Sequence, residues 1–288
     1  MRCPPAAKLE ASQDVDLLAA ARQRPPLAGA YCSYPAVSGE QLAFVTEGEV
    51  WLASLGGGGG AVCVPRRVTD SGAEASRLRF SPDGSLLAYS LYEDGYQEVY
   101  CCASGGGRSK RLTYLGDSCW VAGWSRDGRS VIFASTAGCA DSAVDGRRTL
   151  WQVSVAGGAP ISLGLGPAQS IALQPNGGPG VLLGRDTGDP AVDEWKGYQG
   201  GRGGQLWLDA TGGGTFTQLD PLPGRDDGNC HQLGQIGVPL WLGDRIFFVA
   251  DHSGDAGAGG DLFSCTSRED LRPHGCIQSH PGFCENKS

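Results

Sequence analysis

The chain has 288 residues, 47 of them glycine, and a formal net charge of −8. This acidic balance argues against a nucleic-acid partner, because such a surface needs concentrated positive charge. No apolar run approaches the roughly 20 residues of a transmembrane helix, and the first residues lack the basic, apolar and small-residue order of a signal peptide. We therefore expect neither a nucleic-acid nor a membrane partner, and a cytoplasmic location.

A lead-in predicted as irregular, residues 1–33, precedes the first group of short strands. A turn at Ser38–Glu40 introduces this group, and glycine within the turn favours a tight reversal. The three strands predicted after it are Leu42–Val45, Glu49–Leu52 and Arg66–Thr69.

The second group, centred on Arg79–Ser90, has the clearest pattern. Pro82 fits the first central position of a turn, and Asp83-Gly84 supplies the side-chain bond and the permissive backbone that complete it. The flanking apolar residues alternate with a period of two, which predicts a half-buried antiparallel hairpin. Two further strands are predicted at Glu98–Tyr100 and Lys110–Thr113.

The same strand order recurs three more times. The third copy comprises Val121–Gly128, Val131–Ser135, Leu150–Val153 and Ala159–Leu163; the fourth Ile171–Leu173, Val181–Leu183, Gln205–Leu208 and Phe216–Leu219; the fifth Val238–Leu242, Arg245–Val249 and Asp261–Phe263. Four short antiparallel strands that cannot bury their apolar faces alone describe one blade of a β-propeller. An all-β propeller with five such blades is therefore favoured over the alternative, a β-sandwich.

The blade pattern defines a propeller segment over residues 34–272. After it, residues 273–288 show neither strand alternation nor a blade turn, so we expect a tail outside the propeller. The pattern stops where a further blade would begin, and we therefore expect the chain to be a fragment that lacks one blade.

Several stretches resemble the tricorn protease family. They are Arg111–Tyr114, Leu165–Ala168, Gly184–Thr187, Trp195–Tyr198, Gly200–Gly201, Gln205–Leu208, Asp244–Val249 and Asp270–Arg272, in that order. The Ser-Pro-Asp-Gly turn is also found in TolB-type and prolyl-oligopeptidase-type propellers. The resemblance corresponds to the family's N-terminal propeller, which is six-bladed, so it implies that about five of six blades are present.

The resemblance implies a role in peptide degradation. Tricorn-type enzymes are cytosolic serine peptidases that assemble into hexamers and cut short peptides released by the proteasome. Their catalytic serine and histidine lie in later regions, so the resemblance implies a channel, gating and docking module without an active site. Basic residues of the family's propeller are thought to hold the peptide carboxylate, but the corresponding loop here, Gly116–Cys119, is short and acidic.

The residues themselves give no sign of a catalytic centre. Asp251-His252-Ser253 combines the types found in a serine triad, but consecutive residues of a strand point to opposite faces, which argues against a triad. A Gly-x-Ser-x-Gly elbow does not occur. We expect no catalytic residue in this chain, although the family's peptidase activity leaves open whether a longer protein is an enzyme.

Cysteine and glycine patterns predict neither a metal nor a cofactor. The eleven cysteines form no Cys-x-x-Cys pair, so no zinc site is indicated and free thiols are expected. Adjacent Cys101 and Cys102 follow a strand and are predicted to serve as small apolar side chains. The glycine runs lack the Gly-Lys-Ser/Thr of a phosphate loop.

One loop is the candidate binding site. Gly184–Gly204 is a cationic and aromatic insertion in an acidic chain, and we expect Arg185, Lys196 and Arg202 to contact peptide carboxylates or an acidic patch of a partner subunit. Trp195 and Tyr198 are expected to anchor the loop. The alternative is a solvated loop whose cations only aid solubility.

Two functions remain open. The first is the non-catalytic propeller of a tricorn-type peptidase, with short peptides and further copies of the longer protein as partners. The second is a stand-alone TolB-like propeller that binds a protein or a small ligand, with no peptidase attached. Fold alone does not separate the two.

Overall fold

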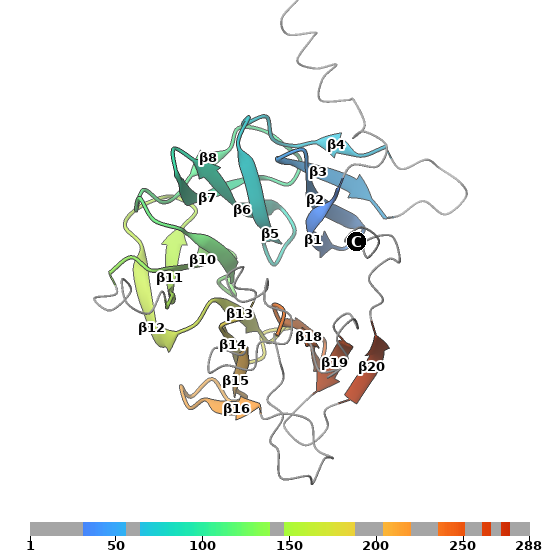
Figure 1. Cartoon of the computed structure of the whole chain (residues 1–288), viewed down its shortest axis with the longest axis vertical. Coiled ribbons are helices and arrows are strands. Elements are labelled where there is room, and N and C mark those ends of the chain that lie inside the picture. The colour runs from blue at the N-terminus through green and yellow to red at the C-terminus, as the bar shows by residue number, and fades with distance from the viewer. Residues whose placement is uncertain are drawn as a thin grey trace, which may run out of the picture. The chain divides into compact units, whose positions relative to one another are not determined.

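The computed structural model describes residues 31–55, 64–138, 147–187, 204–219, 236–250, 261–265 and 272–276. Every regular element among them is a β-strand, and the strands form five antiparallel sheets of four strands each (Figure 1). Two compact units contain these sheets, Met1–Arg111 and Leu112–Ser288. Sheets of this kind are propeller blades, so the prediction of an all-β propeller fold is confirmed.

The first unit contains two sheets, in each of which neighbouring strands follow each other along the chain. Such a meander needs only short turns, as the glycine-rich sequence predicts. Its strands are β1 (Ser33–Ser38), β2 (Gln41–Thr46), β3 (Glu49–Ser54), β4 (Arg66–Arg67), β5 (Glu74–Phe80), β6 (Leu86–Glu93), β7 (Tyr96–Ala103) and β8 (Lys110–Arg111).

The second unit contains three sheets built in the same way. Their strands are β9 (Trp120–Trp124), β10 (Ser130–Ser135), β11 (Thr149–Ser154), β12 (Ile161–Pro167), β13 (Ser170–Leu173), β14 (Val181–Arg185), β15 (Gln205–Asp209), β16 (Thr217–Leu219), β17 (Leu240–Leu242), β18 (Arg245–Ala250), β19 (Asp261–Cys265) and β20 (Arg272–Cys276).

The turn that defines the repeat has the same hydrogen bonds in two sheets. Between β5 and β6, Asp83 Oδ1 accepts from Ser81 Oγ at 2.6 Å and from the Ser85 backbone N–H at 3.0 Å. Between β9 and β10, Asp127 Oδ1 accepts from Ser125 Oγ at 2.6 Å and from the Arg129 N–H at 3.0 Å. In both turns the next residue is a glycine with a φ near +70°, which side chains disfavour (72° at Gly84 and 67° at Gly128).

These bonds predict a dependence of stability on pH. Hydrogen bonds from Ser81, followed by those from Ser85, lower the pKa of Asp83 to about 2, whereas an unfolded aspartate titrates near a pKa of about 3.9. A lowered pKa stabilises the folded state above the unfolded value, and this contribution is lost as the pH falls through the folded value. The stability difference between the wild type and Asp83→Asn should therefore shrink as the pH falls from about 4 to about 2. Urea midpoints measured across this range test the expectation, and a difference that stays constant would contradict it.

Three apolar clusters of the described residues each lie between two neighbouring sheets of one unit. In the first unit, side chains such as Val45, Leu78 and Tyr89 join the sheets of β1–β4 and β5–β8. In the second unit, one cluster joins β9–β12 to β13–β16, and another joins β13–β16 to β17–β20. This arrangement explains why one blade cannot stand alone.

Large aromatic residues recur at matching positions of the third strand in several sheets: Trp51 in β3, Trp151 in β11, Trp207 in β15 and Phe263 in β19. Trp51 is buried, and Trp207 packs against the cluster that joins the sheets of β9–β12 and β13–β16. Trp151 is half-buried, and its Nε1–H donates to Thr149 Oγ1 at 3.0 Å. The side chain of Phe263 lies outside the described residues.

The thiols of the central strand β7 are buried. Both Cys101 and Cys102 are free, and burial raises the pKa of Cys101 to about 11 and that of Cys102 to about 12. A raised pKa keeps a thiol protonated at neutral pH and therefore unreactive. The two residues act as small apolar side chains, as predicted, but they lie within β7 and not after the strand.

The last sheet differs from the prediction at its end. Its fourth strand, β20, runs from Arg272 to Cys276, whereas the propeller segment was expected to end at Arg272. The sequence Arg-Pro-His-Gly-Cys has no alternation of apolar residues. Its proline has no backbone N–H to donate to a neighbouring strand, so it does not favour a strand. An edge strand tolerates proline because one of its sides has no partner, and β20 pairs only with β19 among the described strands.

Candidate functional site

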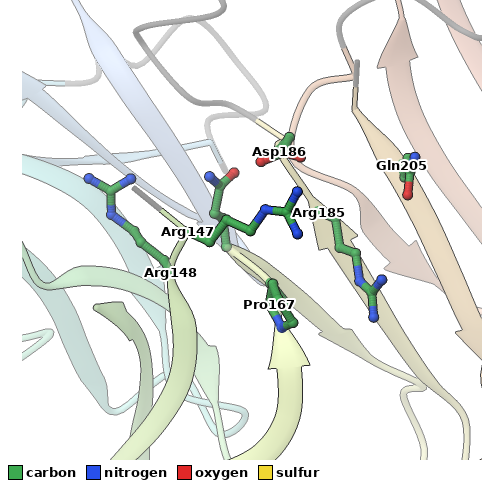
Figure 2. Close-up of a pocket in the computed structure, with 8 residues that line it drawn as sticks. Arg147, Arg148, Pro167, Arg185, Asp186 and Gln205 are labelled. Atoms are coloured by element: carbon green, nitrogen blue, oxygen red, sulfur yellow. The ribbon is translucent and has the colours of Figure 1, made fainter. Parts of the chain in front are cut away.

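A small cavity in the second unit gathers three arginines. We call it the arginine pocket; it has a volume of about 90 Å³ and is lined by Arg147, Arg148, Pro167, Ala168, Gln169, Arg185, Asp186 and Gln205. These residues lie just before β11, at and just after the ends of β12 and β14, and at the start of β15 (Figure 2). The pocket therefore lies where the sheet of β9–β12 meets that of β13–β16.

Strand pairing places Arg185 over an aromatic ring. In the β14–β15 ladder Arg185 is opposite Gln205, so that Trp207 is its diagonal neighbour on the same face. The Arg185 guanidinium carbon lies 4.5 Å from the centroid of the Trp207 ring, and Trp207 Nε1–H donates to Gln205 Oε1 at 3.2 Å. Stacking on a ring that is itself held by a hydrogen bond restricts the orientation of the guanidinium plane.

The other two arginines precede β11 and diverge. The Arg148 guanidinium carbon lies 3.3 Å from the centroid of the Trp120 ring, and its carbonyl accepts the Ala168 N–H at 2.9 Å. Figure 2 shows the Arg147 side chain directed toward the end of β14 that carries Arg185 and Asp186, while Arg148 points away. Arg147 is exposed and forms the outer wall of the pocket.

The pocket rests on a close contact between β13 and β14. Gly184 is opposite Ser170, and the hydroxyl of Ser170 forms a 2.7 Å hydrogen bond with that of Thr187 directly over the glycine. A Cβ atom at position 184 would overlap both hydroxyl oxygens. The Gln169 N–H donates to the Gly184 carbonyl at 2.9 Å, which fixes the buried Gln169 beside Arg185.

The chemistry of the lining is that of an anion site. The lining contains three arginines and one carboxylate, Asp186, in a chain whose net charge is negative. Among the eight lining residues there is no serine, cysteine, histidine or lysine to act as a nucleophile or base. The pocket can therefore hold a negatively charged group, but its lining does not provide a catalytic pair.

Only part of the predicted binding site belongs to the residues that the structure describes. Arg185 lies in the arginine pocket, whereas Lys196, Arg202 and the aromatic anchors Trp195 and Tyr198 belong to residues 188–203, outside the described part. Asp251-His252-Ser253 also lies outside it. Sequence reasoning missed Arg147 and Arg148; the available signal was a pair of arginines directly before a predicted strand.

The family model for the tricorn protease N-terminal beta propeller domain matches residues 29–278. The chain belongs to this family. The match begins before β1 and ends after β20, so it spans all five sheets.

Curated tricorn proteins are similar to this chain over most of its length. Tricorn protease homolog 1 of Streptomyces coelicolor is 38% identical over 251 residues, which cover 86% of this chain and 21% of that protein. A putative tricorn-like protease N-terminal subunit of Sulfurisphaera tokodaii is 26% identical over 190 residues, which cover 64% of this chain and 89% of that protein. The chain thus spans about a fifth of the first relative and most of the second.

Solved structures agree on the fold. The crystal structure of the tricorn protease has a TM-score of 0.69 at 25% identity, and the match covers 88% of this chain and 23% of that one. A putative TolB from Agrobacterium tumefaciens has a TM-score of 0.61 at 19% identity, with 85% and 81% covered, which shows the propeller fold alone.

Three of the stretches that carry the tricorn resemblance converge on the arginine pocket. Leu165–Ala168 supplies Pro167 and Ala168, Gly184–Thr187 supplies Arg185 and Asp186, and Gln205–Leu208 supplies Gln205 and the ring beneath Arg185. Residues far apart in the sequence thus form one local structure of this tricorn propeller.

The described residues give two further results. They include no group of three or more His, Cys, Asp or Glu placed to hold a metal ion. The described part of the chain also contains no helix with the length and apolar character needed to cross a membrane.

Proposed function

We propose that this chain is the non-catalytic propeller module of a tricorn-type serine peptidase that degrades short peptides. The observation that carries the proposal is the family match over residues 29–278, together with 38% identity to a tricorn protease homolog. The proposal places the assembled peptidase in the cytoplasm, downstream of the proteasome and as a homo-oligomer. In that assembly the propeller forms a channel that gates peptides and docks the catalytic part.

The basic residues support a role in handling peptides. Arg185 is held over Trp207 beside Arg147 and Arg148, so cations collect at one place in an acidic chain. We propose that Arg185, together with Lys196 and Arg202 of the loop that follows it, contacts a peptide or a neighbouring subunit. Charge-assisted hydrogen bonds from arginine are well suited to such contacts.

The alternative is a propeller that works as a separate chain. The Sulfurisphaera tokodaii relative is named an N-terminal subunit, and this chain matches 89% of its length. We therefore also consider that the propeller is a separate polypeptide. It would bind either a catalytic subunit or, as a stand-alone TolB-like propeller with no peptidase attached, another protein or a small ligand. The two cases differ in whether a peptidase is the partner.

Reconstitution tests the proposal. The purified chain should not hydrolyse short peptides alone, because its arginine pocket offers no nucleophile and base. Mixed with a tricorn homolog of Streptomyces coelicolor from which the matching propeller has been deleted, it should bind and raise peptide turnover. An unrelated TolB propeller serves as the control. If the chain neither co-elutes with the truncated homolog nor changes its turnover, the stand-alone alternative is favoured.

A further inference from the structure

We propose that the arginine pocket is a binding site for one oxyanion, a carboxylate or phosphate group. The inference goes beyond the peptidase role, because it rests on the pocket itself and holds whether or not a catalytic partner exists. No residue of the pocket other than Arg185 was a predicted binding residue. The evidence consists of the geometry of the arginines, the size of the cavity and its charge.

Arg185 is oriented for an anion by the residues around it. The Arg185 guanidinium carbon lies over the Trp207 ring, 4.5 Å from its centroid, which holds the side chain at the cavity. A guanidinium held over a ring still has N–H donors available to an acceptor. Its Nε is buried and has no hydrogen-bond partner among the described residues. A buried donor of this kind is rare in proteins and would be satisfied by an oxygen of a bound anion.

Three other polar residues line the cavity near Arg185. Gln205, which lies opposite Arg185 in the ladder, and Gln169, which is 5% exposed, place amide groups at the cavity. Arg147 extends toward the same end of β14 from the neighbouring sheet (Figure 2). An anion between Arg147 and Arg185 would thus receive charge-assisted donors from two sides and would connect two sheets.

The size of the cavity limits the ligand to a small group. Pockets that enclose a drug-sized ligand are several times larger than the roughly 90 Å³ of this cavity. The pocket can therefore admit a carboxylate or phosphate group, either as a free ion or at the end of a longer molecule.

The positive charge of the lining also favours a negatively charged ligand. The lining carries three guanidinium groups and one carboxylate, whereas the whole chain has a formal net charge of −8. The guanidinium groups of the pocket repel one another because they lie close together, and a bound anion reduces this repulsion. Arg148, stacked on Trp120 at 3.3 Å, adds to the positive potential without pointing into the cavity (Figure 2).

Titration calorimetry on the purified chain tests the site, in a chloride buffer that contains no oxyanion apart from the probe. Two probes are small ions, acetate and inorganic phosphate. The other two are a short peptide without acidic side chains, once with a free C-terminal carboxylate and once with a C-terminal amide. We expect acetate or phosphate to bind. Tighter binding of the free-acid peptide than of the amide would identify a carboxylate at the end of a longer ligand, and binding of phosphate alone would identify a phosphate group.

Variants connect this binding to the pocket. Arg185→Gln and Arg147→Gln should each weaken anion binding about tenfold or more, which corresponds to about 1.4 kcal/mol. Arg185→Lys retains the charge but loses the planar fork, so it should also weaken binding. Arg129→Gln is the matched control, because it removes the same charge from an exposed turn of the same unit. Circular dichroism of each variant verifies that the sheets are intact.

Two outcomes would overturn the inference. One is that no probe binds, as expected if carboxylates of the chain itself neutralise the arginines. The other is that Arg185→Gln and Arg129→Gln bind the probes equally. Failed reconstitution with the truncated homolog, while anion binding persists, rejects the peptidase role and leaves this site in place; the converse result rejects the site alone.

Discussion

Replacement of Tyr89 by alanine is expected to lower the free energy of unfolding by about 3–5 kcal/mol, the cost of removing a large buried aromatic side chain. Tyr89 is in β6 and is fully buried in the cluster between the two sheets of the first unit. Its ring stacks on that of Tyr100, with centroids 6.0 Å apart and planes at 20°. Its removal leaves a cavity that the neighbouring strands cannot fill. Urea denaturation followed by tryptophan fluorescence measures the loss.

Tyr89→Phe is the control for this experiment, since it keeps the ring and removes only the hydroxyl. Tyr89 Oη–H donates to Ser109 Oγ at 2.6 Å, and loss of this bond should cost about 0.5–1.5 kcal/mol. The alanine variant should therefore be much less stable than the phenylalanine variant. Equal losses for both would mean that the hydrogen bond, rather than the packing of the ring between sheets, stabilises this position.

The fold could be predicted because its repeat is specified locally. Ser81-Pro-Asp-Gly84 and Ser125-Arg-Asp-Gly128 form the same turn through the same side-chain bonds. Strands that follow a turn at once and alternate apolar residues can be recognised within a window of a few residues. This is why the central strands, such as β6 and β10, occur where the sequence placed them.

Edge strands were harder to predict, for a physical reason. β20 has one partner among the described strands and no apolar alternation, since little of an edge strand needs to face a core. The signal that marks a central strand is therefore missing.

The arginine pocket could be predicted only in part. Arg185 was identified from the charge and glycine content of its loop, but its contact with Trp207 depends on the register of β14 and β15. Arg147 reaches the same cavity from another sheet, and such a meeting depends on how two sheets pack. Neither register nor packing between sheets can be inferred from spacing along the chain.

Replacement of Gly184 by alanine is the second large expected effect, a loss of about 1–3 kcal/mol from overpacking. The new methyl group would overlap Ser170 Oγ and Thr187 Oγ1, the buried hydroxyl pair opposite β14. To make room, β14 must move away from β13 or the hydroxyl pair must break. Either change displaces Arg185, so this variant should also bind anions more weakly. Thermal and urea denaturation, followed by calorimetry, measure both effects.

Two further variants show whether steric overlap is the cause. A Cβ atom at Gly123, in β9 of the same unit, would meet Ile171 at an ordinary 3.5 Å, so Gly123→Ala should cost nothing and serves as the matched control. Adding Ser170→Ala to Gly184→Ala removes one of the two overlapping oxygens, so the double variant should lose less stability than the sum of the two single changes. Strict additivity would show that Gly184 is required for a reason other than the space over it, and the support of Arg185 would then have to come from another contact.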